Sequence, residues 1–215
     1  MYCRDIMIDR TEVITVTEDY TLTNALRRMD LYGYRALPVS NYGRLVGTID
    51  LFSIYEHLYI KKDVDLDEAT VKDVMQTDFA YVYGTDVVEV AARLLSNQRI
   101  MFLPVLQDDT GDQFMGIIPV NRLMYMFLSA VGAETKGNRI TVVMNNEKGA
   151  FARLTRQLLR AGANIDGLLS INRMPGQAPD DTTSHVIVKF EGDLERVALA
   201  CQDAGMQVLT KDTLE

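Results

Sequence analysis

The chain contains 215 residues with a mass of 24.2 kDa, which is enough for one large domain or two to three small ones. Hydrophobic residues make up 47% of the chain and charged residues 24%, a composition typical of a globular protein with a sizeable core. The 22 basic and 30 acidic side chains give a formal net charge of −8, which disfavours non-specific binding of nucleic acid or of an anionic membrane surface. Two cysteines exclude a disulfide scaffold. Because no signal peptide or membrane-length apolar run is recognisable, we expect a cytoplasmic protein.

The first two thirds of the chain contain an internal repeat. The strand-like motif Ala36-Leu37-Pro38-Val39 recurs as Phe102-Leu103-Pro104-Val105, at an offset of 66 residues. Apolar positions with helical spacing recur at the same offset: Leu22, Ala25 and Met29 match Val88, Ala91 and Leu95. Gly47-Thr48-Ile49 recurs as Gly116-Ile117-Ile118 after a longer turn in the second copy.

Each copy predicts the element order β-α-β-β-α in about 60 residues. A short strand, Val13–Thr17 or Ala80–Tyr83, precedes the amphipathic helix. Two strands follow, joined in the first copy by a turn at residues 41–43. A closing helix then runs over Asp50–Tyr59 or Val120–Val131. A copy of about 60 residues buries too little core to be stably folded on its own, so we expect the two copies to pack together.

Two such units, with a Leu-Pro-Val strand and a glycine turn before the closing helix, resemble a tandem pair of CBS domains (a Bateman module) over about residues 1–132. The resemblance implies clefts between the repeats that bind an adenosyl compound, such as AMP, ADP, ATP or S-adenosylmethionine, as a regulatory ligand with no required cofactor. The family's cleft carries Thr or Ser three residues after the turn glycine and a ribose-binding Asp six residues after it. Asp50 and Ser53 stand there in the first copy, and Pro119 and Arg122 in the second, so neither copy keeps the usual pair.

The cleft residues that the resemblance implies come from both copies: Thr15, Arg35, Ala36, Pro38, Asp50, Ser53, Met101, Phe102, Pro104 and Arg122. Arg35, just before the Leu-Pro-Val strand, is a candidate phosphate partner. Met101 replaces it in the second copy, where Arg122 brings a cation toward the cleft. The alternative is that Asp50 is only a helix N-cap and Pro119 only a helix start, whatever binds nearby.

The last third of the chain predicts a separate unit. Residues 133–137 form a small polar linker, and the charge changes there: residues 1–136 carry 13 basic and 20 acidic side chains, net −7, and residues 137–215 carry 9 and 10, net −1. Beyond the linker we expect a strand at 139–144 and a helix with Phe151, Leu154, Leu158 and Ala161 on one face, ending at Gly162. Strands at 165–174 and 185–191, a helix over 194–201 and a strand at 206–210 complete a β-α-β-β-α-β, ferredoxin-like order. The predicted fold class is therefore α/β (α+β).

Within this unit, Asn146-Glu147-Lys148-Gly149 followed by Gly162-Ala163-Asn164-Ile165 resembles the ACT domain. The family's pattern is Asp-x-Pro-Gly-x-Leu and then Gly-x-Asn-Ile, so this chain departs at Asn146 and Lys148. The resemblance implies an amino acid bound at the interface of paired domains, by Asn146, Lys148, Gly149, Ala150, Phe151, Asn164 and Ile165. The alternative is that Gly149 and Asn164 only shape two turns in a dimerisation domain without a ligand.

Motifs for catalysis are missing from the sequence. Neither a phosphate-binding glycine loop nor a zinc-protease or C-x-x-C motif occurs, and His57 and His185 fall in different units, as do Cys3 and Cys201. The acidic run 63–68 lacks the glycine and glutamate of a calcium loop and predicts a solvated linker. The Met-rich stretch 123–127 fits a buried or partner-facing helix. We therefore expect neither enzymatic activity nor a metal site.

The predicted domains are CBS 1 over residues 1–68, CBS 2 over 69–132, a linker at 133–137 and ACT over 138–215. This order resembles the acetoin-utilisation regulatory proteins of the AcuB type, and it implies a homodimeric, ligand-sensing regulator acting by a population shift. One alternative is a ligand-free adaptor that docks on a metabolic enzyme. Another is an enzyme with an unrecognised site.

Overall fold

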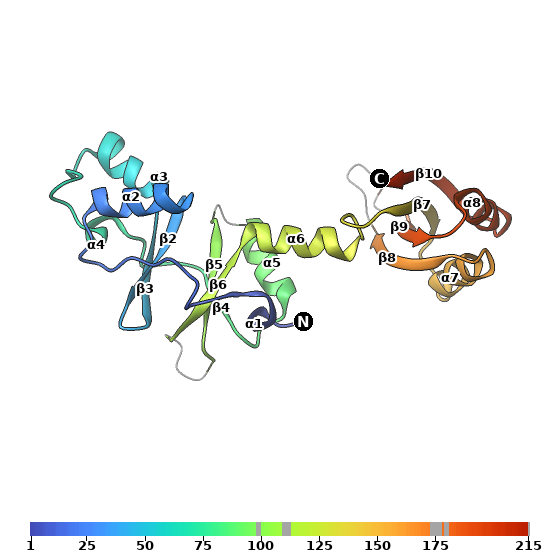
Figure 1. Cartoon of the computed structure of the whole chain (residues 1–215), viewed down its shortest axis with the longest axis horizontal. Coiled ribbons are helices and arrows are strands. Elements are labelled where there is room, and N and C mark those ends of the chain that lie inside the picture. Colours follow the sequence, from blue (N-terminus) through green and yellow to red (C-terminus); the bar gives the residue numbers. More distant parts are fainter. Residues whose placement is uncertain (98–99, 109–112, 173–177, 179–180, 215) are drawn as a thin grey trace. The chain divides into compact units, whose positions relative to one another are not determined.

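The structure is a computed structural model of residues 1–215, and it describes all of them except 98–99, 109–112, 173–177, 179–180 and 215. The chain divides into two compact units, Met1–Leu123 and Met124–Glu215 (Figure 1). The first unit contains the first repeat and the second repeat up to the start of its closing helix. Among the described residues, the second unit contains the rest of that helix and a four-stranded sheet with two further helices.

The first repeat follows the predicted order from its helix onward. It consists of α2 (Leu22–Tyr32), β2 (Ala36–Asn41), β3 (Arg44–Asp50), α3 (Leu51–Tyr55) and the π-helix η1 (Glu56–Lys61). Helix α2 begins where the Thr21 side chain accepts a hydrogen bond from the Asn24 N–H, and it ends at Gly33, whose φ of 69° suits glycine. Leu22, Ala25 and Met29 are buried, as their spacing predicted.

The hairpin of β2 and β3 turns at Tyr42 and Gly43, whose φ values of 51° and 82° are both positive. Two positive φ angles in a two-residue loop match the twist of the flanking strands. The hairpin register pairs Leu37 with Ile49, and both side chains are buried. The predicted turn at residues 41–43 is therefore confirmed.

The second repeat has the same order: β4 (Val82–Tyr83), α5 (Val88–Asn97), β5 (Phe102–Leu106), β6 (Phe114–Pro119) and α6 (Val120–Ala130). The first strand of each copy is shorter than predicted. In place of a strand over Val13–Thr17, a single parallel bridge joins Val16 to Val39. Pairing stops there because the chain turns at once: the Thr17 hydroxyl donates to Asp19, and the Tyr20 N–H donates to the Thr17 carbonyl.

The repeats exchange their leading segments. Strand β1 (Ile8–Asp9), at the start of the chain, pairs with β6 of the second repeat. The equivalent Gln76, at the start of the second copy, bridges Thr48 on β3 of the first. Two short capped helices, α1 (Cys3–Ile6) and α4 (Val71–Val74), precede these contacts, each with a capping box closed by an aspartate, Asp5 or Asp73. Each repeat thus completes its sheet with a segment that precedes the other repeat.

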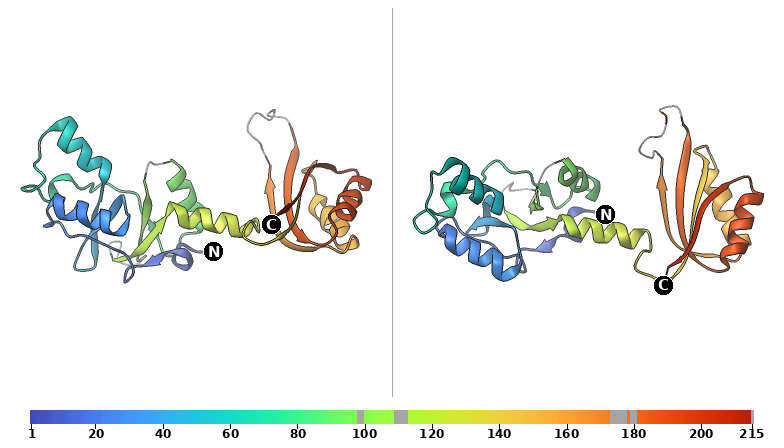
Figure 2. Two further views of the ribbon diagram at one scale, coloured as in Figure 1. Left: turned by 45° about the horizontal axis from the view of Figure 1, so that its top comes forward. Right: turned by 90° about the horizontal axis from the view of Figure 1, so that it is seen from above.

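The C-terminal unit has the predicted β-α-β-β-α-β order. Its elements are β7 (Gly137–Asn145), α7 (Ala150–Arg160), β8 (Asn164–Ile171), β9 (Thr183–Glu191), α8 (Leu194–Asp203) and β10 (Gln207–Leu214). The sheet order β10-β7-β9-β8 is antiparallel throughout, which is the ferredoxin-like arrangement. Figure 2 shows α7 and α8 on the same face of this sheet.

The core of this unit lies between the sheet and its two helices. It includes Ile140, Val188 and Phe190 from the strands and Leu154, Leu158 and Cys201 from the helices. Phe151 was expected on the buried face of α7, but it is 39% exposed. It lies in the first turn of the helix, one residue after the buried Ala150, whereas the other three predicted positions, Leu154, Leu158 and Ala161, are buried.

The opposite face of the sheet is partly covered by the residues that follow α6. A Cβ on Gly167 of β8 would lie 2.9 Å from the carbonyl carbon of Val131, so only glycine leaves room for this close approach. Beside it, Lys189 of β9 is fully buried, and its Nζ donates to the Thr135 carbonyl at 2.5 Å. The stem of Lys189 lies against Gly132 and Gly137.

Candidate functional site

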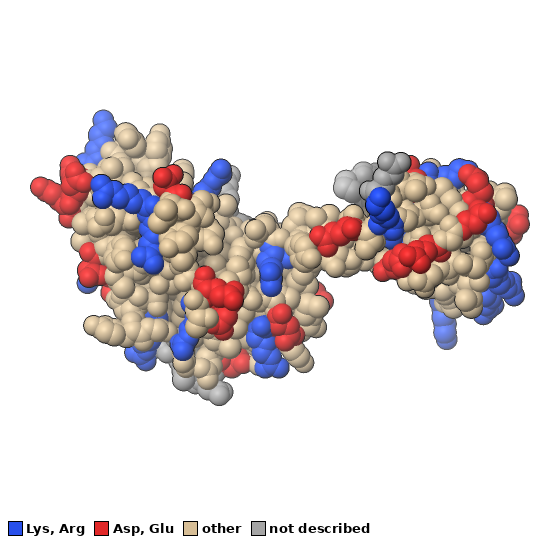
Figure 3. Space-filling model, in the orientation of Figure 1, with Lys and Arg blue, Asp and Glu red and all other residues tan. Residues whose placement is uncertain are grey.

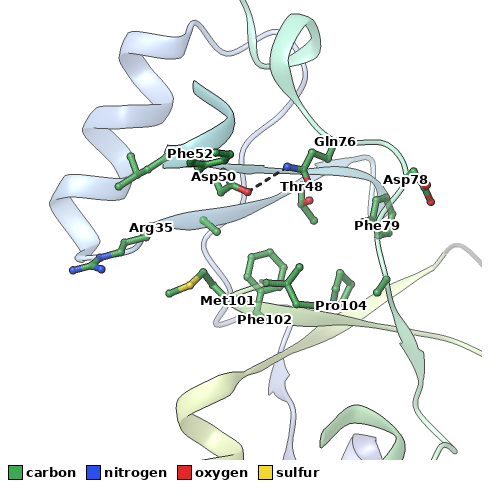
Figure 4. A pocket seen from close by; sticks show the side chains of 14 residues that line it. Arg35, Thr48, Asp50, Phe52, Gln76, Asp78, Phe79, Met101, Phe102 and Pro104 are labelled. Carbon is green, nitrogen blue, oxygen red and sulfur yellow. Dashed lines mark hydrogen bonds between the residues drawn. The ribbon is translucent and has the colours of Figure 1, made fainter. Parts of the chain in front are cut away.

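A cleft in the first unit is lined by residues from both repeats. Its volume is about 530 Å³, within the range of small-molecule sites. The first repeat contributes the start of β2, the end of β3 and the start of α3. The second repeat contributes the start of β5, and the segment after α4 lies between them (Figure 4). The lining residues are Arg35, Ala36, Thr48, Asp50, Leu51, Phe52, Gln76, Asp78, Phe79, Ala80, Ile100, Met101, Phe102 and Pro104.

Asp50 links the cleft to the start of α3. Its Oδ1 accepts hydrogen bonds from the Ser53 N–H at 2.7 Å and from the Ser53 hydroxyl at 2.8 Å. Among the described residues, its Oδ2 has only a long contact of 3.4 Å with the Gln76 Nε2 amide, which also donates to Ser53 Oγ at 3.1 Å. Oδ1 is therefore engaged in capping the helix, and Oδ2 can still accept hydrogen bonds from a ligand.

The remaining wall of the cleft is mainly apolar. Phe79, Phe102 and Pro104 lie on its lower and right side in Figure 4, with Met101 beside them. Phe102 is buried, whereas Met101 is 51% exposed. Aromatic faces next to a carboxylate suit a ligand that has a flat apolar part joined to a hydroxylated part.

The charged groups of the cleft are few. Arg35 is exposed, and Figure 4 shows its side chain directed away from Asp50. Asp78, also exposed, lies on the opposite side of the view. More widely, on the face drawn in Figure 3, acidic and basic side chains of the first unit are scattered without a continuous basic patch.

Six of the ten cleft residues expected from the sequence line the cleft: Arg35, Ala36, Asp50, Met101, Phe102 and Pro104. Ser53 is buried behind Asp50, and Pro38 is buried in the middle of β2. Thr15 lies outside the lining, just before the bridge at Val16. The Nε of Arg122 donates to the Ile6 carbonyl at 3.1 Å, so this guanidinium is held by the N-terminal segment that packs on the second repeat.

Several lining residues had no signal in the sequence. Gln76, Asp78 and Phe79 follow α4 in a segment without helical or strand periodicity, and they reach the cleft only because this segment bridges to β3 of the other repeat. Thr48 could have been found from its position one residue after Gly47 in the repeated turn. The alternation of buried and half-buried residues along β3 places its side chain on the cleft side.

The ACT-like residues of the C-terminal unit lie at two separate places. Gly149 has a φ of 85° and caps the start of α7, where Glu147 forms an ion pair with Arg153 at 2.6 Å. Asn164 and Ile165 begin β8, beyond the other end of the same helix. Because α7 has 11 residues, these groups are separated by about 16 Å of helix. The structure therefore does not bring them together within one chain.

Other titratable groups do not form a further site among the described residues. His57 Nδ1 is 2.9 Å from Asp63 and its Nε2 is 3.2 Å from Lys61. Cys3 and Cys201 are both buried, and burial raises the pKa of each thiol to about 11, with Asp86 and Glu89 adding to the effect at Cys3. Within the described ranges, no three His, Cys, Asp or Glu side chains gather as metal ligands. None of the described helices is long and apolar enough to span a membrane.

Comparison with known proteins identifies the first unit. The profile of the CBS domain matches residues 3–60 and 71–129, which is more than half of the chain. The chain belongs to the CBS domain family. CBS domains are in general regulatory modules rather than catalysts, and the predicted tandem CBS pair is therefore confirmed.

Individual relatives match mainly over the CBS pair. The inosine-5'-monophosphate dehydrogenase of Methanocaldococcus jannaschii is 30% identical over 132 residues, which cover 61% of this chain and 25% of that enzyme. This chain thus spans about a quarter of that relative's length. Among solved structures, a CBS domain-containing protein of Bacillus anthracis is 23% identical, with a TM-score of 0.52, over 59% of this chain and 92% of its own. CBSX2 of Arabidopsis thaliana is 22% identical, with a TM-score of 0.53, over 59% of this chain and 94% of its own. A structure of CBSX2 in complex with AMP gives 24% identity, a TM-score of 0.52, and coverage of 59% and 96%.

Proposed function

We propose that the CBS pair binds an adenosine-containing ligand in the cleft between its repeats. In this proposal the protein is a non-catalytic regulator whose conformational equilibrium shifts when the ligand binds. The observation that carries this proposal is Asp50 Oδ2, a carboxylate oxygen with one long contact, beside an aromatic wall. This oxygen can accept hydrogen bonds from the ribose hydroxyls, and Phe79 and Phe102 offer apolar surface for the base. That CBSX2, which has a similar fold, is known in complex with AMP supports this choice of ligand class.

A thermal-shift and calorimetric titration with adenosine, AMP and S-adenosylmethionine tests this proposal. A ligand at 100 times its dissociation constant should stabilise the unit by about 2.7 kcal/mol. Asp50→Asn should weaken binding at least tenfold while keeping the helix cap, since Asn caps as well as Asp. Asp30→Asn, an exposed carboxylate on α2 outside the cleft, is the matched control. The proposal is wrong if none of these compounds binds, or if Asp50→Asn and Asp30→Asn bind equally well.

We infer for the C-terminal unit that it is an ACT domain, that it pairs two chains, and that the protein is a cytoplasmic regulator of the AcuB type. The ferredoxin-like sheet and the positive φ of Gly149 at the start of α7 support this assignment. The separation of Gly149 from Asn164 indicates that an amino-acid site needs the loop of one chain and the strand start of another.

Mixing experiments separate a shared site from a dimerisation domain without a ligand. If the site is shared, Lys148→Ala and Asn164→Ala chains should each lose amino-acid binding, and the mixed dimer should regain one site of two. Sedimentation equilibrium of the unaltered protein should give a dimer. A monomer would refute the pairing, and a dimer that binds no amino acid would leave dimerisation as the role of this unit.

A ligand-free adaptor is the second candidate, favoured by one observation. The surface of α2, α3 and η1 exposes a group of large apolar and aromatic side chains, Leu31, Tyr32, Phe52, Tyr55, Tyr59 and Ile60. The rings of Tyr55 and Tyr59 are 5.2 Å apart. Exposed apolar groups of this kind are typical of protein interfaces. Failure of every adenosine compound to bind, with retention of a metabolic enzyme on the immobilised protein, would favour this reading.

A further inference from the structure

We propose that a groove along α2 of the first repeat binds a small organic anion, a phosphate or a carboxylate that carries an aromatic group. The volume of the groove is about 340 Å³, at the lower end of the range for small-molecule sites. Its lining residues are Tyr20, Asn24, Arg27, Arg28, Leu31 and Tyr32. None of them lines the cleft between the repeats, so this site is additional to the proposed adenosine site and does not depend on it.

The groove follows one face of α2. Successive lining residues, from Tyr20 to Tyr32, are one, three or four positions apart, and side chains three or four positions apart are neighbours on a helix. Tyr20 precedes the helix, and its backbone is fixed because its carbonyl accepts a hydrogen bond from the Val71 N–H at 2.8 Å. The groove therefore has a rigid end at Tyr20 and a rigid floor along the helix.

Arg28 is held in position in this groove. Its Nη1 donates to the Tyr20 hydroxyl at 3.0 Å, and its guanidinium carbon lies 5.8 Å from the centre of the Tyr20 ring, within the reach of a cation–π interaction. The Nε of Arg28 is buried and has no hydrogen-bond partner among the described residues. A guanidinium that is positioned but incompletely hydrogen-bonded is prepared to bind an anion, because little side-chain freedom remains to be lost.

Arg27 and Asn24 add further donors beside Arg28. Both side chains are exposed, and in the part of the chain that the structure describes neither forms a hydrogen bond or an ion pair. The described lining contains two cations and no carboxylate. Asp30 is the only acidic residue in the sequence of α2, and it is outside the lining. The groove is thus locally positive in a unit whose residues 1–123 contain 12 basic and 19 acidic side chains.

The lining also indicates the chemical class of the ligand. The fork of N–H groups on a guanidinium matches the oxygens of a phosphate or a carboxylate. Beside the arginines, Leu31 is 76% exposed and Tyr32 is 48% exposed, and these side chains offer apolar surface to an aromatic group of the ligand. The negative charge of the surrounding unit opposes a large polyanion, which favours a small ligand with a single anionic group.

The second repeat indicates that the fold does not require these polar side chains. At the repeat offset of 66 residues, Arg28 corresponds to Leu94 and Tyr20 corresponds to Asp86. Helix α5 nevertheless occupies the same place in the order of its repeat as α2 does in the first. The tyrosine and the arginine of the first repeat therefore provide something beyond the packing of the helix, and a binding site on its surface accounts for both.

Calorimetric titration of the full chain with phenyl phosphate, benzoate and inorganic phosphate tests the proposal. Phenyl phosphate or benzoate should bind once per chain and at least tenfold more tightly than inorganic phosphate, and the tighter of the two identifies the anionic group. Arg28→Gln and Arg27→Gln should each weaken this binding at least tenfold. Because Arg27 is exposed, its replacement reports on binding even if Arg28→Gln lowers the melting temperature.

Two control variants separate the groove from other effects. Arg93 on α5 is the counterpart of Arg27 at the repeat offset, and Arg93→Gln should leave the affinity within twofold. Asp50→Asn, in the cleft between the repeats, should do the same. If Arg93→Gln weakened binding as much as Arg27→Gln, the effect would be one of net charge and the inference would be wrong.

Three other results would also overturn the inference. The first is that neither phenyl phosphate nor benzoate binds. The second is that Asp50→Asn abolishes their binding, because the anion would then occupy the cleft, and the proposed adenosine site would still stand. The third is that a polyglutamate peptide binds while both small anions fail to bind, because the groove would then serve an acidic protein partner.

Discussion

Replacing Lys189 with Met should stabilise the C-terminal unit. Lys189 is fully buried in β9, and its ammonium donates to the Thr135 carbonyl. Among the described residues, no carboxylate forms an ion pair with it. A buried cation without a counter-charge is unusual in a protein core. Its replacement by an apolar side chain measures how much the buried charge lowers the free energy of unfolding.

Lys189→Met is expected to raise the free energy of unfolding of the C-terminal unit by about 1–2 kcal/mol. Burying one ammonium costs several kcal/mol even after the protein relaxes, and a hydrogen bond to a charged group returns about 1.5–3 kcal/mol. Met keeps most of the stem that lies against Gly132 and Gly137, and the carbonyl of the exposed Thr135 can bind water instead. Lys189→Ala should instead destabilise the unit by about 2–3 kcal/mol, because it also removes the stem and leaves a cavity.

Hydrogen exchange of the full chain, followed by mass spectrometry of peptides from β7 and β9, reports this unit separately from the CBS pair. Exchange in Lys189→Met should slow by about 5- to 30-fold, which corresponds to the expected free energy. Lys211→Met is the matched control, because Lys211 forms an exposed ion pair with Glu195 and such pairs contribute at most about 1 kcal/mol. Faster exchange in Lys189→Met than in the unaltered chain would refute the reasoning, since the hydrogen bond would then outweigh the cost of burial.

Three further predictions concern single positions. Asp50→Ala should lower the stability of the first unit by about 1 kcal/mol in urea unfolding, because α3 loses its N-cap; a stability equal to that of Asp50→Asn would exclude the capping role. Gly116→Ala should cost more than about 2 kcal/mol and expose the first ten residues to protease, because its Cβ would lie 2.0 Å from the Ile8 carbonyl oxygen. An unchanged proteolysis pattern would contradict this. Because burial raises the pKa of Cys201 to about 11, its thiol stays protonated at pH 8, and alkylation should be far slower in the folded protein than in urea. Equal rates in the two states would show that this thiol is accessible.

The repeat made much of the fold predictable from the sequence. Two copies of one pattern at a fixed offset indicated which apolar positions share a helix face, and Leu22, Ala25 and Met29 are buried accordingly. Local turn chemistry was equally informative, as at Gly149 and at the Tyr42-Gly43 turn. The π-helix over residues 56–61 had no signal, because its apolar spacing is also compatible with an α-helix.

Non-local pairing was the part that the sequence did not reveal. The bridge of Gln76 to Thr48 depends on which edge of the β2–β3 hairpin is left unpaired. A segment with only two or three paired residues is too short to show a periodicity from which its partner strand could be predicted. Asp50 and Met101 adjoin the repeated motifs and could therefore be assigned to the cleft. Phe79 reaches the cleft only through this non-local bridge, so the sequence did not reveal it. Phe151 keeps its helical spacing to Leu154 and Leu158 but lies in the first turn of α7, and helical spacing alone does not report how far the core extends along a helix.

The exchange of leading segments between the two repeats has a consequence for how the first unit can be divided. A break in the acidic linker at residues 63–68 would not release two folded domains, because the N-terminal fragment carries β1, which belongs to the sheet of the second repeat, and the C-terminal fragment carries Gln76, which belongs to the first. Each fragment would therefore lack one edge segment of its own sheet and would carry, unpaired, an edge segment that belongs to the sheet of the other fragment. The two fragments should therefore be unstable alone and recover the fold when mixed, so that the linked repeats behave as one cooperative structure with a single melting transition.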